Sequence, residues 1–255
     1  MSKIIRSSII KKLIFYAIIV IIWHSIYLAD IVPELILPSP FQVGESLGLL
    51  IINGTLPYAI GTSFIRLLIG FIIAISIGFA LGYYMAKYKT VYDTLGSLVL
   101  GLQSIPSMAW VPIGLIWFGI NDMGIIFVII ASTIFSVAMS TYTGIKNVPP
   151  IYIKAATNMG AKGFTLLYEV VLPAALPYLI SGLRQAWSFA WRGLISAEML
   201  FALLGVGFLL IAARNIYNMA QVIAIMLVIM GIGLAMDSLI FSRIERKIAA
   251  RYGMR

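Results

Sequence analysis

The stretch KAATNMGAKGFTLLYEVVLP, residues 154–173, is the longest polar interruption between the hydrophobic segments of this chain. A short helical pattern over residues 151–159 leads into Gly160, and glycine ends many helices because it tolerates positive φ. A second short helical pattern follows over residues 161–169. Pro173 then stands where proline is tolerated, at the start of a long apolar segment. The stretch therefore predicts two short helices that lead to the foot of a membrane helix.

The whole connection, residues 145–173, is long for a link between packed helices, since such loops usually contain only a few residues. Ala155 and Ala156 keep one face of the first predicted helix shallow, so that another surface can approach it closely. An ordinary connecting loop is the alternative. We expect instead a structured segment that contacts a partner protein.

The composition predicts a membrane protein. The 255 residues are 62% hydrophobic and only 11% charged, whereas a soluble domain carries about 25% charged residues. The chain has no cysteine and one histidine, which excludes disulfides and thiolate metal sites and argues against a histidine metal site. The sequence also lacks the clustered His, Cys or carboxylate groups of a membrane enzyme, so we expect a non-catalytic chain.

About 20 apolar residues are needed for a membrane-spanning helix. Pro106 and Pro112 lie inside the third candidate span, and each removes a helix hydrogen bond, so this region can be two pieces. The basic N-terminus and the first apolar run resemble a signal peptide. That run is longer than a usual signal core and lacks a small-x-small cleavage site, so we expect a retained span. The pattern predicts one all-α transmembrane domain over residues 1–255, with spans at 12–29, 58–86, 92–118, 123–144, 174–200 and 218–241.

Lys and Arg mark the cytoplasmic side of membrane proteins. Most of the 18 basic residues fall in the N-terminus, in residues 84–93, in residues 145–172 and in a tail that ends at Arg255. Residues 30–57 carry three acids and no Lys or Arg. We therefore expect both termini and the 145–173 connection to be cytoplasmic. The net charge of +9 then reports topology, and we expect no nucleic-acid partner.

The connection on the opposite side, residues 30–57, predicts an outer-face segment. Its LILPSP run (35–40) is a stop-and-turn signal, because proline ends helices and favours extended backbone. Apolar residues then recur at helical spacing. We expect an amphipathic, interfacial helix on the outer face, with Val43, Leu47, Leu50 and Ile51 on its apolar side.

The long polar connection resembles the EAA loop of ABC importer permeases, E-A-A-x3-G-x9-I-x-L-P. Two residues depart from that pattern: Val170 replaces isoleucine and Lys154 replaces the glutamate. The lysine reverses a charge, which implies either a compensating acid on the partner or a tolerant, solvent-exposed position. The residues that match in register are Ala155, Ala156, Gly160, Leu172 and Pro173.

Other stretches resemble the nitrate/sulfonate/taurine branch of the same family. LPSP (37–40) is similar to its outer-loop signature, and SFIRLLIGFIIAISIGFALG (63–82) to its S-L-x-R-x3-G-F helix. SIPSMAWVPIGLIWFGI (104–120) and AEMLFALLGVG (197–207) are similar to two further motifs. The resemblance covers nearly the whole chain.

The resemblance implies the type I, MetI-like permease fold in the inner membrane. In this family the EAA loop forms a coupling helix that docks on a separate ATP-binding subunit. Two such subunits drive two permease copies, usually a homodimer, between inward- and outward-facing states, and a binding protein delivers cargo at the outer face. The chain has no G-x4-G-K-[ST] loop, so ATP and Mg²⁺ belong to the partner and no cofactor is expected here.

The branch implies a small anionic cargo of the nitrate, sulfonate or taurine class. A vitamin precursor, such as a pyrimidine or a riboflavin-like compound, is the alternative within the family. An ion-coupled secondary carrier is the alternative outside it, and it would need intramembrane acids such as Asp237 and Glu198.

Charges inside spans usually face a cavity or a partner. Arg66 and Arg192 either line a translocation path and attract an anion or pair with a polar group, and Glu198 is a plausible partner that favours the second alternative. Glu198, Ser104 and Ser107 are further path candidates. Arg184 is expected to be structural. Finally, Gly78 and Gly82 predict close helix packing, because small residues four apart let two helix backbones approach.

Overall fold

The computed structural model describes residues 2–201 and 203–251. Met1, Ala202 and residues 252–255, which include Arg255 of the predicted basic tail, lie outside the described residues. Every regular element in the described part is helical, as predicted. In chain order the elements are α1 (Ser2–Leu28), α2 (Pro40–Ile52), α3 (Thr55–Lys87), α4 (Lys89–Gln103), η1 (Ser107–Trp110), α5 (Val111–Phe118), α6 (Asp122–Lys146), α7 (Pro150–Asn158), α8 (Gly163–Leu166), η2 (Leu167–Val171), α9 (Leu172–Phe201), α10 (Val206–Asn215), α11 (Met219–Met236), η3 (Asp237–Phe241) and α12 (Ser242–Arg251).

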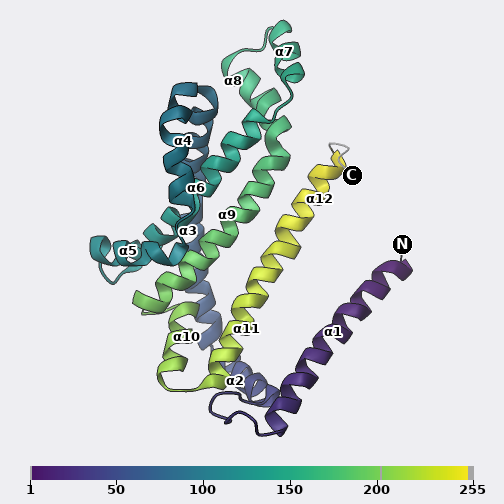
Figure 1. Cartoon of the computed structure of the whole chain (residues 1–255), viewed down its shortest axis with the longest axis vertical. Coiled ribbons are helices and arrows are strands. Elements are labelled where there is room, and N and C mark those ends of the chain that lie inside the picture. Colours follow the sequence, from purple (N-terminus) through teal and green to yellow (C-terminus); the bar gives the residue numbers. More distant parts are fainter. Residues whose placement is uncertain (1, 202, 252–255) are drawn as a thin grey trace.

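Three long helices, α3, α6 and α9, pack together at the centre of the molecule (Figure 1). Small residues bring their backbones together. A β-carbon added to Gly82 would lie 2.3 Å from the carbonyl oxygen of Ala138, and one added to Gly78 would lie 2.7 Å from that of Ile134. The predicted close packing at these two glycines is confirmed. Gly182 of α9 approaches α6 in the same way, since its added β-carbon would lie 2.2 Å from that of Ser140.

Five helical stretches are long and apolar enough to cross a membrane: Ile10–Leu28, Thr55–Lys87, Asp122–Lys146, Gly163–Phe201 and Met219–Ile248. A sixth is obtained if α4 and the η1–α5 helix count as one broken span, bent by 102°. The break lies at Pro106, which has no N–H to continue the helix. The predicted third span, residues 92–118, is therefore two pieces, and the other five predicted spans correspond to the five long stretches.

The two ends of the bundle differ as the charge pattern predicts. In Figure 1 the α3–α4 turn lies at the same end as α7 and α8, whereas α2 and the α10–α11 turn lie at the opposite end. The first end carries the basic connections and the second carries the acidic segment 30–57. This arrangement agrees with a cytoplasmic position for α7 and α8.

The predicted helix of the outer-face segment is α2, Pro40–Ile52. Ser39 caps it in a capping box: Ser39 Oγ accepts from the Gln42 backbone N–H at 3.2 Å, and Gln42 Oε1 accepts from that of Ser39 at 2.8 Å. Pro40 follows at the first helical position, where its missing N–H has no consequence. Of the predicted apolar side, Val43 and Leu50 are buried, whereas Ile51 is exposed.

Helix α1 stands apart from the bundle (Figure 1). None of its apolar stretch Ile10–Leu28 is buried. Its contacts are with the segment that follows it, including a hydrogen bond from Trp23 Nε1 to the Pro38 carbonyl oxygen at 3.0 Å. Apart from these contacts, the surface of the stretch Ile10–Leu28 is free for lipid or for another protein.

Candidate functional site

Arg66 and Glu198 form a buried ion pair between α3 and α9. Arg66 Nη1 lies 2.9 Å from Glu198 Oε1, and the two side chains are 8% and 0% exposed. A second acid, Asp122 at the start of α6, accepts from Arg66 Nε at 2.9 Å and is 64% exposed. Since a buried charge is tolerated only when it is paired and hydrogen-bonded, this cluster fixes three helices relative to one another.

The Glu198 carboxylate also holds the turn between α9 and α10. It accepts from Ser63 Oγ at 2.8 Å and from the Gly207 backbone N–H at 3.0 Å, and Ser63 Oγ in turn accepts from the Val206 N–H at 2.9 Å. Gly205 has φ +134, and an added β-carbon there would lie 2.3 Å from Glu198 Oε1. The glycine lets the turn close over the acid.

Arg66 and Glu198 therefore lie inside the bundle and not on an open path. These contacts favour the alternative in which Arg66 joins helices. Sequence reasoning suggested Glu198 as an arginine partner but did not identify Asp122 as the second acid. Its signal was weak, because Asp122 follows Asn121 in a short polar turn that looks like a simple helix cap.

Arg184 is also paired. Its guanidinium binds Asp237 of η3 through two hydrogen bonds, at 2.5 and 2.7 Å, and Glu245 of α12 through one at 2.7 Å. The pair joins α9 to the C-terminal helices, in agreement with its predicted structural role. Both acids that a secondary carrier would need, Asp237 and Glu198, are thus occupied by arginines.

Arg192 differs from the other two intramembrane arginines. Its side chain is exposed, and no acid among the described residues lies within ion-pair distance. Its contacts are local: Nε donates to the Ser188 carbonyl oxygen at 3.1 Å, and the guanidinium lies 5.0 Å from the Phe189 ring centroid. Arg192 is therefore an uncompensated positive charge on the open face of α9.

Ser104 and Ser107 flank the break between α4 and η1. Ser104 is exposed and its Oγ donates to the Gly101 carbonyl oxygen at 2.7 Å, whereas Ser107 is half-buried. The structure does not bring either one together with the Arg66 cluster. Both lie at the bend: Ser104 caps the C-terminus of α4 and Ser107 is the first residue of η1.

The segment 145–173 is structured by its own apolar contacts. Val148, Val171 and Ala175 form a small buried cluster against which Ile153 of α7 packs. Helix α7, Pro150–Asn158, ends before Gly160, which has φ +92 as the sequence predicts. Lys154 and Ala155 are exposed on α7 and Ala156 is half-buried, while Leu172 and Pro173 begin α9 after a π-helical turn.

Apolar side chains remain uncovered around this helix. Five large apolar side chains within residues 151–168 are exposed, and patches of such side chains mark interaction surfaces. They are Ile151 at 66%, Tyr152 at 54%, Met159 at 89%, Phe164 at 78% and Tyr168 at 64%.

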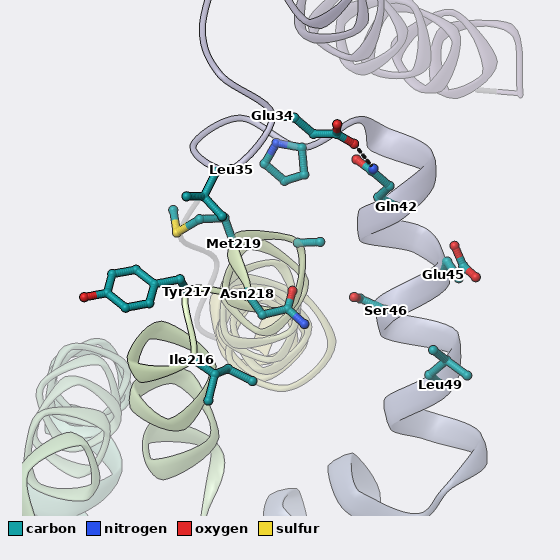
Figure 2. A pocket seen from close by; sticks show the side chains of 12 residues that line it. Glu34, Leu35, Gln42, Glu45, Ser46, Leu49, Ile216, Tyr217, Asn218 and Met219 are labelled. Atoms are coloured by element: carbon teal, nitrogen blue, oxygen red, sulfur yellow. Dashed lines mark hydrogen bonds between the residues drawn. The ribbon is translucent and has the colours of Figure 1, made fainter.

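At the opposite end a cavity of about 600 Å³ lies between α2 and the α10–α11 turn (Figure 2). Ser46 and Asn218 point into the space, and Gln42 Nε2 donates to Glu34 at its edge. Glu45 also belongs to the lining, which contains no Lys or Arg. Sequence reasoning did not find this cavity, because its two walls are far apart in the chain.

The chain is similar to known transport proteins over most of its length. Residues 74–250 match the family model described as binding-protein-dependent transport system inner membrane component. A putative ABC transporter permease protein of Methanocaldococcus jannaschii is 36% identical over 92% of this chain and 90% of its own length. The taurine transport system permease protein of Escherichia coli is 30% identical over 77% and 74%. A solved structure of an inward-facing methionine ABC transporter has a TM-score of 0.60 at 20% identity, over 81% of this chain and 94% of its own.

Proposed function

Because this chain belongs to the binding-protein-dependent inner membrane components of ABC importers, we propose that it forms the translocation path for a small anionic solute. Family membership makes it a multi-pass inner membrane permease without catalysis or cofactor of its own. ATP hydrolysis takes place on a separate ATP-binding subunit, and a binding protein delivers the cargo.

The exposure of Arg192 is the observation that supports an anionic cargo. Of Arg66, Arg184 and Arg192, it alone is exposed and has no acid partner among the described residues. An unpaired charge within a membrane span faces water or a solute rather than lipid. The similarity to a taurine permease supports a cargo with an oxyanion group, because taurine carries a sulfonate. We assign Arg66, Glu198 and Arg184 to structural roles. Ser104 and Ser107, which flank the bend between α4 and η1, are assigned to the translocation path.

The coupling segment is assigned to residues 145–173. Support comes from the exposed apolar side chains around α7 and from the register of Ala155, Ala156 and Gly160 with the EAA pattern. We assign Leu172 and Pro173 to the connection that transmits movement of α7 to α9.

We assign α1 to contact with a second copy of this chain, which gives a homodimer with two ATP-binding subunits. The support is that its apolar stretch is entirely unburied and lies apart from its own bundle. The cavity between α2 and the α10–α11 turn is assigned to the binding protein. Its two glutamates and its lack of basic residues fit a Lys or Arg side chain of that partner.

Uptake into proteoliposomes tests the function. The chain is purified in complex with its ATP-binding subunit, and the mass of the complex is measured by native mass spectrometry. Uptake of taurine, ethanesulfonate, nitrate and uracil is then measured with the binding protein outside the vesicles. We expect a complex with two copies of each subunit. We also expect uptake of taurine, ethanesulfonate or nitrate that needs ATP inside and persists when ion gradients are collapsed. Uptake that persists without the ATPase and stops with an ionophore would contradict an ABC importer. Uptake of uracil alone would contradict an anionic cargo.

The Arg192→Gln variant is tested in the same vesicles. Loss of one charge-assisted hydrogen bond to the cargo is expected to lower uptake about tenfold or more. The complex should remain assembled and its ATPase active, because Arg192 has no interhelical partner among the described residues. Disassembly of the complex would show that Arg192 is structural.

Lys154→Glu tests the reversed charge of the coupling segment. If the ATPase groove carries a compensating acid, the exchange places two like charges together and is expected to reduce binding-protein-stimulated ATPase activity several-fold. Lys154→Gln is the matched control, since it removes the charge without reversing it. Equal coupling in all three proteins would mean that Lys154 is simply solvated.

A further inference from the structure

A groove lies between α3 and α9, over α6. It begins where α3 and α9 touch, because the rings of Phe71 and Trp187 pack edge to face there with centroids 5.3 Å apart. One turn further along both helices, a cavity of about 180 Å³ opens between α3, α6 and α9. Apart from Gly182 and the hydroxyl residues Ser140 and Thr141, its lining side chains are hydrocarbons: Ile75, Phe79, Val137, Leu176, Leu179, Ile180 and Leu183.

A cavity of about 280 Å³ continues this groove toward the end of the bundle that carries the basic connections. It lies one turn further along each wall. Tyr83 follows Phe79 by four residues on α3, and Ile145 follows Thr141 by four residues on α6. The third wall passes from α9 into η2 and α8. We call the two cavities together the α3–α9 groove.

The length of the α3–α9 groove matches one leaflet of a bilayer. Ile75 in the first cavity and Lys87 in the second are twelve residues apart on α3, which corresponds to about 18 Å along a helix. Half of a bilayer, with its headgroups, is about 20 Å thick. The groove therefore covers the depth that one lipid molecule occupies.

The apolar cavity opens toward hydrocarbon and not toward the face of α9 that carries Arg192. Leu183 lies nine residues from Arg192, which is half a turn around an α-helix at 100° per residue. On the other wall, Ile72 precedes Phe79 by seven residues, lies on the same face of α3 and is 61% exposed. Lipid tails are as apolar as these side chains. An acyl chain of the surrounding bilayer can therefore enter the groove without crossing a polar surface.

The other cavity forms a basic and aromatic mouth. Lys87 lines it, with Nζ 5.7 Å from the Tyr83 ring centroid and 5.2 Å from that of Tyr88. Lys146 and Lys162 are exposed, and each adjoins a lining residue in the sequence. In the part of the chain that the structure describes, no acid lines either cavity and none of these lysines has an acid within ion-pair distance. Lysines and tyrosines at the end of a membrane helix lie at the level of the lipid headgroups.

We propose that the α3–α9 groove binds one anionic phospholipid of the cytoplasmic leaflet. An acyl chain lies in the apolar cavity, and the phosphate accepts hydrogen bonds from the Lys87 ammonium at the mouth. A zwitterionic lipid fits the apolar cavity equally well but brings its own cation to the lysines, so the site discriminates by headgroup charge. Because α3, α8 and η2 all line the mouth, the bound lipid joins the coupling segment to the bundle. Its effect on coupling rests on the proposed function, whereas its binding does not.

Lipid retention by the assembled complex tests the site. The complex is exchanged into detergent with equal amounts of phosphatidylglycerol and phosphatidylcholine, and native mass spectrometry counts the lipids that stay bound. We expect the wild type to retain phosphatidylglycerol in preference, and Lys87→Gln to lower that retention about fivefold. Lys12→Gln is the matched control, since Lys12 is an exposed lysine of α1, which stands apart from the bundle. Equal retention of the two lipids by the wild type, or equal losses in the two variants, would overturn the proposal. Gel filtration confirms that both variants are folded.

A photoreactive acyl chain then locates the bound lipid. Phosphatidylglycerol with a diazirine at its chain end is expected to crosslink to Phe79, Leu179 or Leu183, and Lys87→Gln should reduce these crosslinks. Crosslinks no more frequent there than on α1 would overturn the proposal, because the apolar stretch of α1 is entirely unburied and reports chance contact with lipid. Displacement of the lipid by inorganic phosphate or glycerol phosphate would also overturn it, in favour of a soluble phosphate ligand. Crosslinking at the groove in a complex without ATP-driven uptake would support the lipid site and contradict only the proposed function.

Discussion

Replacing Glu198 with alanine is expected to destabilise the folded chain by about 3–5 kcal/mol, the range found when one partner of a buried ion pair is removed. The change leaves Arg66, which is 8% exposed, with the exposed Asp122 as its acid partner and the Leu204 carbonyl oxygen as an acceptor. It also removes the acceptor for Ser63 Oγ and for the Gly207 N–H. The α9–α10 turn then loses the group on which it closes.

Thermal unfolding of the purified protein in detergent measures this effect. Asp122→Asn is the matched control, because it removes the exposed acid of the same cluster and is expected to change stability by less than about 1 kcal/mol. The double variant Arg66→Met with Glu198→Met should be less destabilised than the sum of the two single changes, since it leaves no buried charge without a partner. An additive double variant, or a Glu198→Ala protein as stable as the wild type, would show that the pair does not join the helices.

Gly82→Leu is expected to separate α3 from α6 and to abolish folded protein. Even the β-carbon of alanine would lie 2.3 Å from the Ala138 carbonyl oxygen and 2.6 Å from the Thr141 β-carbon. Backbone atoms cannot move aside as a flexible side chain can, so the helices must part. We expect Gly82→Ala alone to destabilise by about 1–3 kcal/mol, as overpacking does.

Gly61→Ala is the control for this change, because Gly61 lies on the same helix and has nothing within 4 Å of an added β-carbon. It is expected to be neutral or stabilising, since alanine favours helix by about 1 kcal/mol over glycine. The yield of monodisperse protein by gel filtration and the thermal midpoint distinguish the two variants. Similar behaviour of Gly82→Ala and Gly61→Ala would contradict the close contact.

Local patterns in the sequence were sufficient to predict where the helices lie. Proline placement predicted the division of residues 92–118, and Gly160 predicted the end of α7, because both effects act on the backbone of the residue concerned. Long apolar runs predicted the spans, because the length and hydropathy of a segment are also local properties of the sequence. The glycines of α3 predicted close packing but not the partner helix, since residue size says only how near a neighbour can come.

The polar contacts between distant segments could not be predicted in the same way. Arg66 lies 56 residues from Asp122 and 132 from Glu198, and many other pairings were compatible with the pattern. Exposure was equally hidden: Arg192 and Arg66 look alike in sequence, yet one is open and the other enclosed.

The continuous helical stretch Gly163–Phe201 has 39 residues, which corresponds to a rod of about 58 Å. One of its tight contacts with α6, Gly182 against Ser140, lies at the midpoint of that rod, and another, Gly193 against Ser132, lies further along it. If the rod tilts as one body about the Gly182 contact, its two ends move in opposite directions by equal distances, because the contact lies at the midpoint. A tilt of about 5° then moves each tip by roughly 2.5 Å in opposite directions, given the 1.5 Å rise per residue. A push at the coupling end would therefore widen one mouth of the bundle by the same amount that it narrows the other.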